Sequence, residues 1–72
     1  MNSLIPEHLR NYLAEAINPE TPSYRLKMLA GHQEWLIRSL VAKNPSTPSV
    51  SIENLLQDNH PLVRDSAYYG RR

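Results

Sequence analysis

A hexapeptide that recurs at a fixed distance constrains the fold of this chain more than any other feature of its sequence. The segment NPETPS at positions 18–23 returns as NPSTPS at positions 44–49, an offset of 26 residues. A period of 20–50 residues is typical of proteins built from stacked copies of one small structural unit. The recurrence therefore predicts a repeat architecture.

The register of the repetition extends beyond the hexapeptide. Four apolar or mixed segments keep the same offset: Ala16 and Ala42, Leu26 and Ile52, Leu29 and Leu55, and Leu36-Ile37-Arg38 and Leu62-Val63-Arg64. A chance match would not keep both a polar turn and an apolar spacing. The predicted organisation is a single domain with an N-terminal capping helix at 1–17, one repeat at 18–43, a second repeat at 44–69 that runs into a partial third unit, and a tail at 70–72.

Each hexapeptide holds the residues that end one helix and begin the next. A residue before proline is disfavoured in the α region, so Asn18 and Asn44 should terminate the preceding helices. Thr21 and Thr47 are predicted to be N-caps, with the proline that follows each of them at the first helical position.

Between the hexapeptides the apolar residues recur at helical spacing, and only the short 50–52 segment alternates as a strand would. Gly31 and Gly70 are expected to cap the second and fifth helices at their C-terminal ends. The predicted fold class is all-α, a short α-solenoid of longer helices alternating with shorter ones that are partly 3₁₀, over residues 5–17, 22–30, 33–43, 48–57 and 61–69.

Composition bounds the possible functions. The chain has 72 residues, 40% of them apolar and 21% charged, which fits a folded globular protein with a small core. The absence of cysteine from the sequence excludes disulfides, thiolate zinc sites and cysteine-ligated iron–sulfur clusters, and no cofactor is expected. The N-terminus lacks the pattern of a signal peptide, and no apolar run approaches the roughly 20 residues that cross a bilayer, so a cytoplasmic protein without membrane contact is expected.

The second half of the chain resembles the leucine-rich repeat variant family, whose pattern is V-R-x-x-V-A-x-N-P-x-T-P, then L-A-x-D, then P-x-V-R. The matching segments are IRSLVAKNPSTP at 37–48, LLQD at 55–58 and PLVR at 61–64. The preceding unit matches at N-P-x-T-P and at Leu29-Ala30, but has His32 where the family has Asp and Trp35 where it has Pro. Asn11-Tyr12 replaces V-R in the first helix, and Tyr68-Tyr69-Gly70 replaces A-x-N at the end.

The resemblance implies a right-handed stack of helices, related in its logic to HEAT and armadillo solenoids. It implies no particular activity. Some relatives carry a cysteine-ligated cluster domain in front of the repeats, which this cysteine-free sequence lacks.

Two arginines at equivalent positions, Arg38 and Arg64, have two possible roles. Similar HEAT-type repeats place an Asp and an Arg six residues apart, as Asp58 and Arg64 are, and use them to bridge neighbouring units. Alternatively, both arginines face a groove and bind phosphate or carboxylate, which suits their bidentate geometry.

No constellation for catalysis or metal binding is visible in the sequence. His8, His32 and His60 are too scattered for a metal site and are expected at the surface or in helix caps. Neither a glycine-rich phosphate loop nor a nucleophile elbow is present, so an enzyme is not expected.

The aromatic residues offer further candidates. Trp35 and Leu36 are predicted on the buried side of the third helix, with Trp35 packed between the two repeats; an exposed Trp35 would instead be a hot spot for binding. The segment from Tyr68 to Arg72 suits nucleic-acid stacking or a protein interface, unless it is a frayed end with one tyrosine in the core.

The function expected from these observations is that of a non-enzymatic protein-interaction module, a small bacterial accessory or regulatory protein. The alternative is binding of a nucleic-acid backbone by arginine and lysine on one face, against which stands a net charge of only +1. Clustering of the basic side chains on one face would favour nucleic acid, and dispersal or acidic pairing would favour protein. The candidate partner-binding residues are Arg38, Lys43, Arg64, Tyr68, Tyr69, Arg71 and Arg72.

Self-association is a further expectation. The third unit lacks the turn that would begin its second helix, so the apolar side of the fifth helix, formed by Leu62, Val63, Ala67 and Tyr68, is predicted to have no covering neighbour. A homodimer that pairs this C-terminal unit would cover it. Alternatively, the fifth helix folds back on the first four helices and covers this side itself, with Tyr68 and Tyr69 as a lid.

Overall fold

The computed structural model describes residues 6–70 and is entirely helical in its regular structure over that range. The helices in chain order are α1 (Glu7–Ile17), α2 (Ser23–Leu29), α3 (Trp35–Lys43), α4 (Ser49–Leu55) and α5 (Pro61–Tyr69). The prediction of five helices is confirmed for the described residues, and the predicted ends differ from these by at most two residues. The short helices α2 and α4 are α-helical and not 3₁₀.

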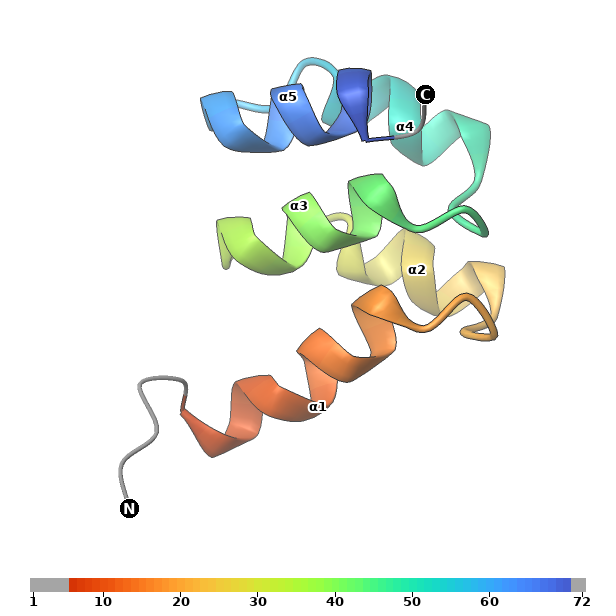
Figure 1. Cartoon of the computed structure of the whole chain (residues 1–72), viewed down its shortest axis with the longest axis vertical. Helices are drawn as coiled ribbons and strands as arrows, with labels where there is room; N and C mark the ends of the chain where they lie inside the picture. Colours follow the sequence, from red (N-terminus) through yellow and green to blue (C-terminus); the bar gives the residue numbers. More distant parts are fainter. Residues whose placement is uncertain (1–5, 71–72) are drawn as a thin grey trace.

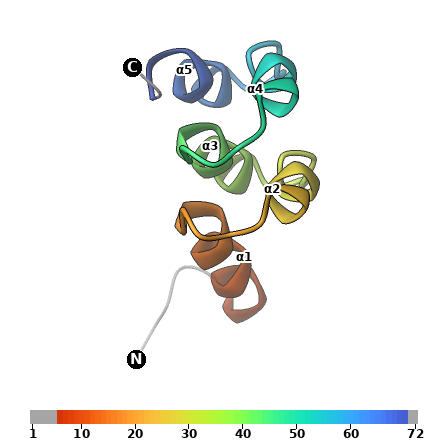
Figure 2. The same ribbon diagram turned by 90° about the vertical axis from the view of Figure 1, so that its right-hand side faces the viewer.

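The helices form two layers. Figure 1 shows α1, α3 and α5 stacked side by side, and the view of Figure 2 places α2 and α4 together in a second column beside them. The central helix α3 packs most extensively against α5 and next against α1. In the described part of the chain the longest helix has 11 residues, and none is long and apolar enough to cross a membrane.

One apolar core runs between the two layers, and α3 is at its centre. The buried apolar residues come from all five helices: Ala16, Leu26, Leu29, Ile37, Val41, Ala42, Leu55, Val63 and Ala67. Leu29 and Leu55, predicted to be buried at equivalent positions, are only 3% and 2% exposed. This part of the repeat alignment is confirmed.

The prediction that Val63 and Ala67 lack a covering neighbour is wrong. Val63 is 0% exposed and Ala67 is 4% exposed, because these two positions of α5 pack within the core. They are equivalent to Ile37 and Val41 of α3, which are also buried. Within the apolar side that was predicted for α5, exposure is high only at its edges, where Leu62 is 50% and Tyr68 54% exposed.

The predicted N-caps are also wrong. Pro22 and Pro48 are the N-cap residues of α2 and α4, with extended backbone, and neither provides a side-chain cap. The hydroxyl of Thr21 instead donates to the carbonyl oxygen of Glu15 at 2.7 Å, and that of Thr47 donates to the carbonyl oxygen of Val41 at 2.7 Å. Both threonines therefore add a second hydrogen bond to a carbonyl group in the last turn of the preceding helix, beside the one from the amide of Asn18 or Asn44.

The helix ends at the two Asn-Pro dipeptides are where the sequence placed them. Asn18 and Asn44 are the C-caps of α1 and α3, and both have extended backbone conformations. Of the two expected glycine caps, Gly31 is wrong, because Ala30 is the C-cap of α2. Gly70 is the C-cap of α5 as expected, but its φ of −68° is right-handed. A Cβ at position 70 would lie 2.5 Å from the carbonyl oxygen of Ser66 and 2.7 Å from Cγ of Lys43, so close packing and not a left-handed turn requires glycine there.

The two hexapeptides contact each other directly. The buried Asn44 amide donates to the carbonyl oxygens of Ala16 at 2.8 Å and Asn18 at 2.9 Å. Ser46 Oγ donates to the carbonyl oxygen of Pro19 at 2.6 Å. The second turn is thus fixed on the first by hydrogen bonds that span 26 to 28 residues of sequence.

Candidate functional site

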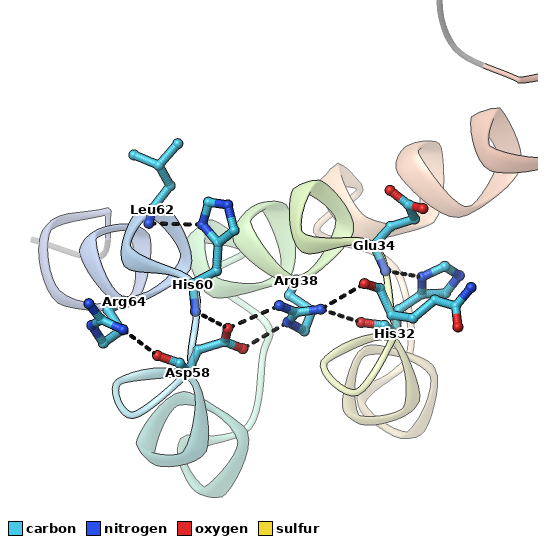
Figure 3. A network of polar contacts seen from close by, with 8 residues as sticks. His32, Glu34, Arg38, Asp58, His60, Leu62 and Arg64 are labelled. Atoms are coloured by element: carbon cyan, nitrogen blue, oxygen red, sulfur yellow. Dashed lines mark hydrogen bonds and ion pairs between the residues drawn. The ribbon is translucent and has the colours of Figure 1, made fainter.

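A bidentate ion pair joins α3 to the turn between α4 and α5. Arg38 Nε donates to Asp58 Oδ2 at 2.8 Å, and Arg38 Nη2 donates to Asp58 Oδ1 at 3.0 Å. The remaining nitrogen, Nη1, donates to the carbonyl oxygens of His32 at 2.7 Å and Gln33 at 3.1 Å. Figure 3 shows the guanidinium held between the two turns, so the bridging role of Arg38 is confirmed.

The electrostatics of Asp58 fit this structural role. Burial raises the pKa of Asp58, but the hydrogen bonds from Arg38 and from the backbone amide of His60 outweigh it and hold the pKa below its ordinary value. The side chains of Arg38 and Asp58 are only 14% and 10% exposed. The carboxylate is therefore ionised and fully engaged at neutral pH.

Arg64, the equivalent of Arg38 in the next unit, repeats its bond to a backbone carbonyl group. Arg64 Nη1 donates to the carbonyl oxygen of Asp58 at 2.7 Å, just as Arg38 Nη1 does to His32. One unit earlier the pair is an aromatic contact, because the equivalent residues are Tyr12 and His32, whose rings lie 5.0 Å apart. Successive units of the described residues thus hold a Tyr–His contact, an Arg–Asp ion pair, and an arginine that bonds to a backbone carbonyl group.

Two of the histidines serve in turns, as expected of capping residues. His60 is the N-cap of α5, and its Nδ1 accepts a hydrogen bond from the amide of Leu62 at 3.1 Å. His32 Nδ1 accepts from the amide of Glu34 at 3.0 Å. Within residues 6–70 no three histidine, aspartate or glutamate side chains group in a way that would hold a metal ion.

Trp35 contacts the second repeat through His60, as predicted, but its side chain is not buried. Its side chain is 37% exposed, and its ring stacks on His60 at a centroid distance of 4.4 Å and an interplanar angle of 13°. Leu36, also predicted on the buried side, is 38% exposed. Both lie in the first turn of α3, where they border solvent and not the core.

An open hollow lies between α3 and α5. It has a volume of about 430 Å³, and its apolar edge is formed by Trp35, Leu36, Leu62 and Tyr69. Ser39 and Ser66 form its floor, and their buried hydroxyl groups share a short hydrogen bond between the two helices. A smaller hollow of about 220 Å³ continues between α1 and α3 and shares Trp35 and Leu36.

The candidate residues divide among three places. Arg38 is in the ion pair, Lys43 and Tyr69 line the hollow, and Arg64 of α5 reaches back to the carbonyl oxygen of Asp58 in the turn before that helix. Tyr68 and Tyr69 are both exposed and contact each other edge to face at 4.8 Å, so neither is tucked into the core. Arg71 and Arg72 lie outside the described residues.

One ion pair was missed in the sequence. Glu15 of α1 and Arg25 of α2 form two hydrogen bonds, at 2.9 Å and 2.7 Å, and the Arg25 guanidinium holds the pKa of Glu15 below its usual value. The equivalent residues of the next unit, Val41 and Ser51, are uncharged. The sequence contained a signal for this ion pair, because Glu15 and Arg25 have opposite charges and their equivalents Val41 and Ser51 are both buried.

Comparison with known proteins identifies no relative. No family model matches the sequence, and neither the curated proteins nor the solved structures include a significant match.

Proposed function

We propose that this chain is a non-enzymatic protein-interaction module that binds a protein partner through the surface of a short right-handed α-solenoid of the leucine-rich repeat variant type. The observation that carries the proposal is the row of exposed apolar side chains along the hollow between α3 and α5. Trp35, Leu36, Leu62 and Tyr69 are each between 37% and 65% exposed and border one continuous depression. Aromatic and aliphatic side chains around a hollow are what a protein interface uses as anchors.

The placement of the basic residues favours a protein partner over nucleic acid. The donors of Arg38 are already bonded to Asp58 and to two backbone carbonyl groups. Lys43 lines the hollow, and the acidic Asp65 lines the same hollow. Arg64 bonds to the carbonyl oxygen of Asp58 and does not line this hollow. A nucleic-acid backbone needs several uncommitted cations along one path, and Arg38 is not available for such a path.

The test is site-specific photo-crosslinking in the native host. A photoreactive phenylalanine analogue at Leu62 should trap a defined protein, while the same analogue at the exposed Val50 of α4 serves as the matched control. Nuclease treatment before purification should leave the product unchanged. Trapping that requires intact nucleic acid, or that is equal at both positions, would contradict the proposal.

Self-association is a second form of the same proposal. The exposed Leu62 and Tyr69 belong to the C-terminal unit, and burying them against a second copy would close the hollow on both chains at once. The localisation that fits this function is the cytoplasm.

A further inference from the structure

The outward side of the last unit repeats a surface that is covered one unit earlier. We call this surface the end face; its members are Ile52, Leu56, Arg64, Asp65 and Tyr68. The equivalent positions 26 residues earlier are Leu26, Ala30, Arg38, Ser39 and Ala42, of which none is exposed. On the end face only Ile52 is half-buried, and the other four residues are exposed. The same positions are therefore covered by a following unit in one place and open to solvent in the other.

Arg64 indicates which chemical group a segment that covers the end face would carry. Its Nη1 makes the same bond to a carbonyl oxygen six residues back as Arg38 Nη1 does, at the same 2.7 Å. In Arg38 the Nε and Nη2 edge is filled by the two oxygens of Asp58. Within residues 6–70 no acceptor bonds to this edge of Arg64. Figure 3 shows the difference: two dashed lines join Arg38 to a carboxylate, while the single line from Arg64 leads to the backbone.

We propose that the end face is a docking site for a partner protein's helical hairpin that places an aspartate or glutamate, in the turn before a helix, against Arg64. This inference rests on the proposed function and names the chemistry of the partner. Asp58 is the template, because it sits in the turn between α4 and α5 and meets Arg38 in two charge-assisted hydrogen bonds. The apolar contacts would come from Leu56, Ile52 and Tyr68, as they come from Ala30, Leu26 and Ala42 in the covered unit.

Asp65 adds a second requirement for the chemistry of the partner. It takes the position of Ser39, whose hydroxyl meets the hydroxyl of Ser66 on the next helix. A partner helix must therefore present a hydrogen-bond donor against Asp65 as well as a carboxylate against Arg64. A phosphate backbone carries no such donor, and its charge would be repelled by Asp65.

A peptide that copies residues 48–70 is the direct probe, because it contains the Asp58 turn that covers α3 within the chain. The full chain, labelled with ¹⁵N, is titrated with this peptide up to roughly millimolar concentration, with an Asp58→Asn peptide as matched control. We expect the Arg64 Nε–H resonance to shift, and the Asn peptide to bind about tenfold more weakly, as the loss of one charged hydrogen-bonded pair predicts. In an Arg64→Gln chain the two peptides should bind alike. No binding, or equal binding of both peptides to the wild-type chain, would overturn the proposal.

The crosslinking described above separates this inference from the interaction function itself. The Leu62 crosslink is repeated in Arg64→Gln and in Arg10→Gln, which removes the same charge from the exposed far end of the molecule. Loss of the product only in Arg64→Gln agrees with the end face. An unchanged product in Arg64→Gln overturns the end face and leaves the interaction function standing, while a wild-type chain that traps nothing refutes the interaction function.

Discussion

At the scale of single residues, the two threonines of the hexapeptides show how one motif fits two structures. A threonine before a proline is compatible with capping the next helix or with donating to the last turn of the previous one. The structure takes the second option: Thr21 and Thr47 donate to carbonyl groups six residues earlier, which also accept the backbone amide of the helix C-cap residue. The sequence could not decide this, since the choice depends on the backbone path through the turn.

Substitutions at Thr47 separate the two roles. Thr47→Val keeps the shape but removes the donor to a buried carbonyl, so we expect a loss of about 1–2 kcal/mol in the free energy of unfolding. Thr47→Ser should retain most of the stability. Thr47→Asp is the deciding control, because aspartate is a good N-cap but cannot donate a hydrogen bond when ionised. Urea denaturation followed by circular dichroism measures all three, and an Asp variant at least as stable as wild type would contradict the donor role.

Asp58 predicts how stability depends on acidity. Its pKa in the folded chain lies below the ordinary 3.8, so the unfolded chain binds the proton more readily. The stabilisation is fully present above about pH 5 and is lost as the pH falls through 3.8 towards the folded pKa. We expect Asp58→Asn to lose about 1–3 kcal/mol at pH 7 and to approach wild type in acid.

Thermal unfolding of Asp58→Asn and wild type between pH 7 and the acid limit measures this convergence. Glu15→Gln is run alongside, since the pKa of Glu15 is lowered too, but in a pair that is more exposed. A stability difference for Asp58→Asn that stays constant across the range would show that the carboxylate charge does not contribute.

At the level of helices, the sequence predicted the number of elements in the described residues, and it predicted their ends to within two residues. The Asn-Pro dipeptides and the apolar spacing are local signals, and they are sufficient for this. The covered side of α5 was not predictable in the same way. Val63 and Leu62 are neighbours of similar hydrophobicity, yet one is 0% and the other 50% exposed, because the direction of packing against α3 decides between them.

Truncation of paired leucines tests the packing of α4. Leu55→Ala removes a side chain that is 2% exposed and should cost roughly 2–5 kcal/mol. Its neighbour Leu56 is 39% exposed, so Leu56→Ala should cost much less and serves as the matched control. Equal losses in a chemical denaturation experiment would mean that α4 is rotated relative to the packing described above.

At the scale of the whole molecule, contacts between equivalent positions turn a sequence repetition into a stack. Asn44 reaches back to Ala16 and Asn18, and Arg38 reaches forward to Asp58. The resemblance implied arginine–aspartate bridges between units, but its spacing of six residues pointed to Asp58 and Arg64, whereas the carboxylate pairs with Arg38. The stacking of Trp35 on His60 could not be anticipated, because it depends on the first turn of α3 and the turn before α5, which meet only after folding. Hydrogen bonds and an ion pair fix the register between units, and the apolar core holds them together.

The last prediction concerns the assembly of the whole chain: at tens of micromolar it associates through the hollow between α3 and α5. The apolar edge of that hollow includes Leu62 and Tyr69, which are 50% and 65% exposed. Covering a few hundred Å² at ~25 cal/mol per Å² would contribute several kcal/mol before the cost of association.

Sedimentation equilibrium should give a mass above 8.3 kDa for wild type and a monomer for the Leu62→Ser, Tyr69→Ser double variant. Val63 is left intact, because it is buried and its loss would unfold the chain. Val50→Ser, on the exposed side of α4, is the control that should still associate, and a wild-type chain that sediments at 8.3 kDa throughout would exclude the dimer.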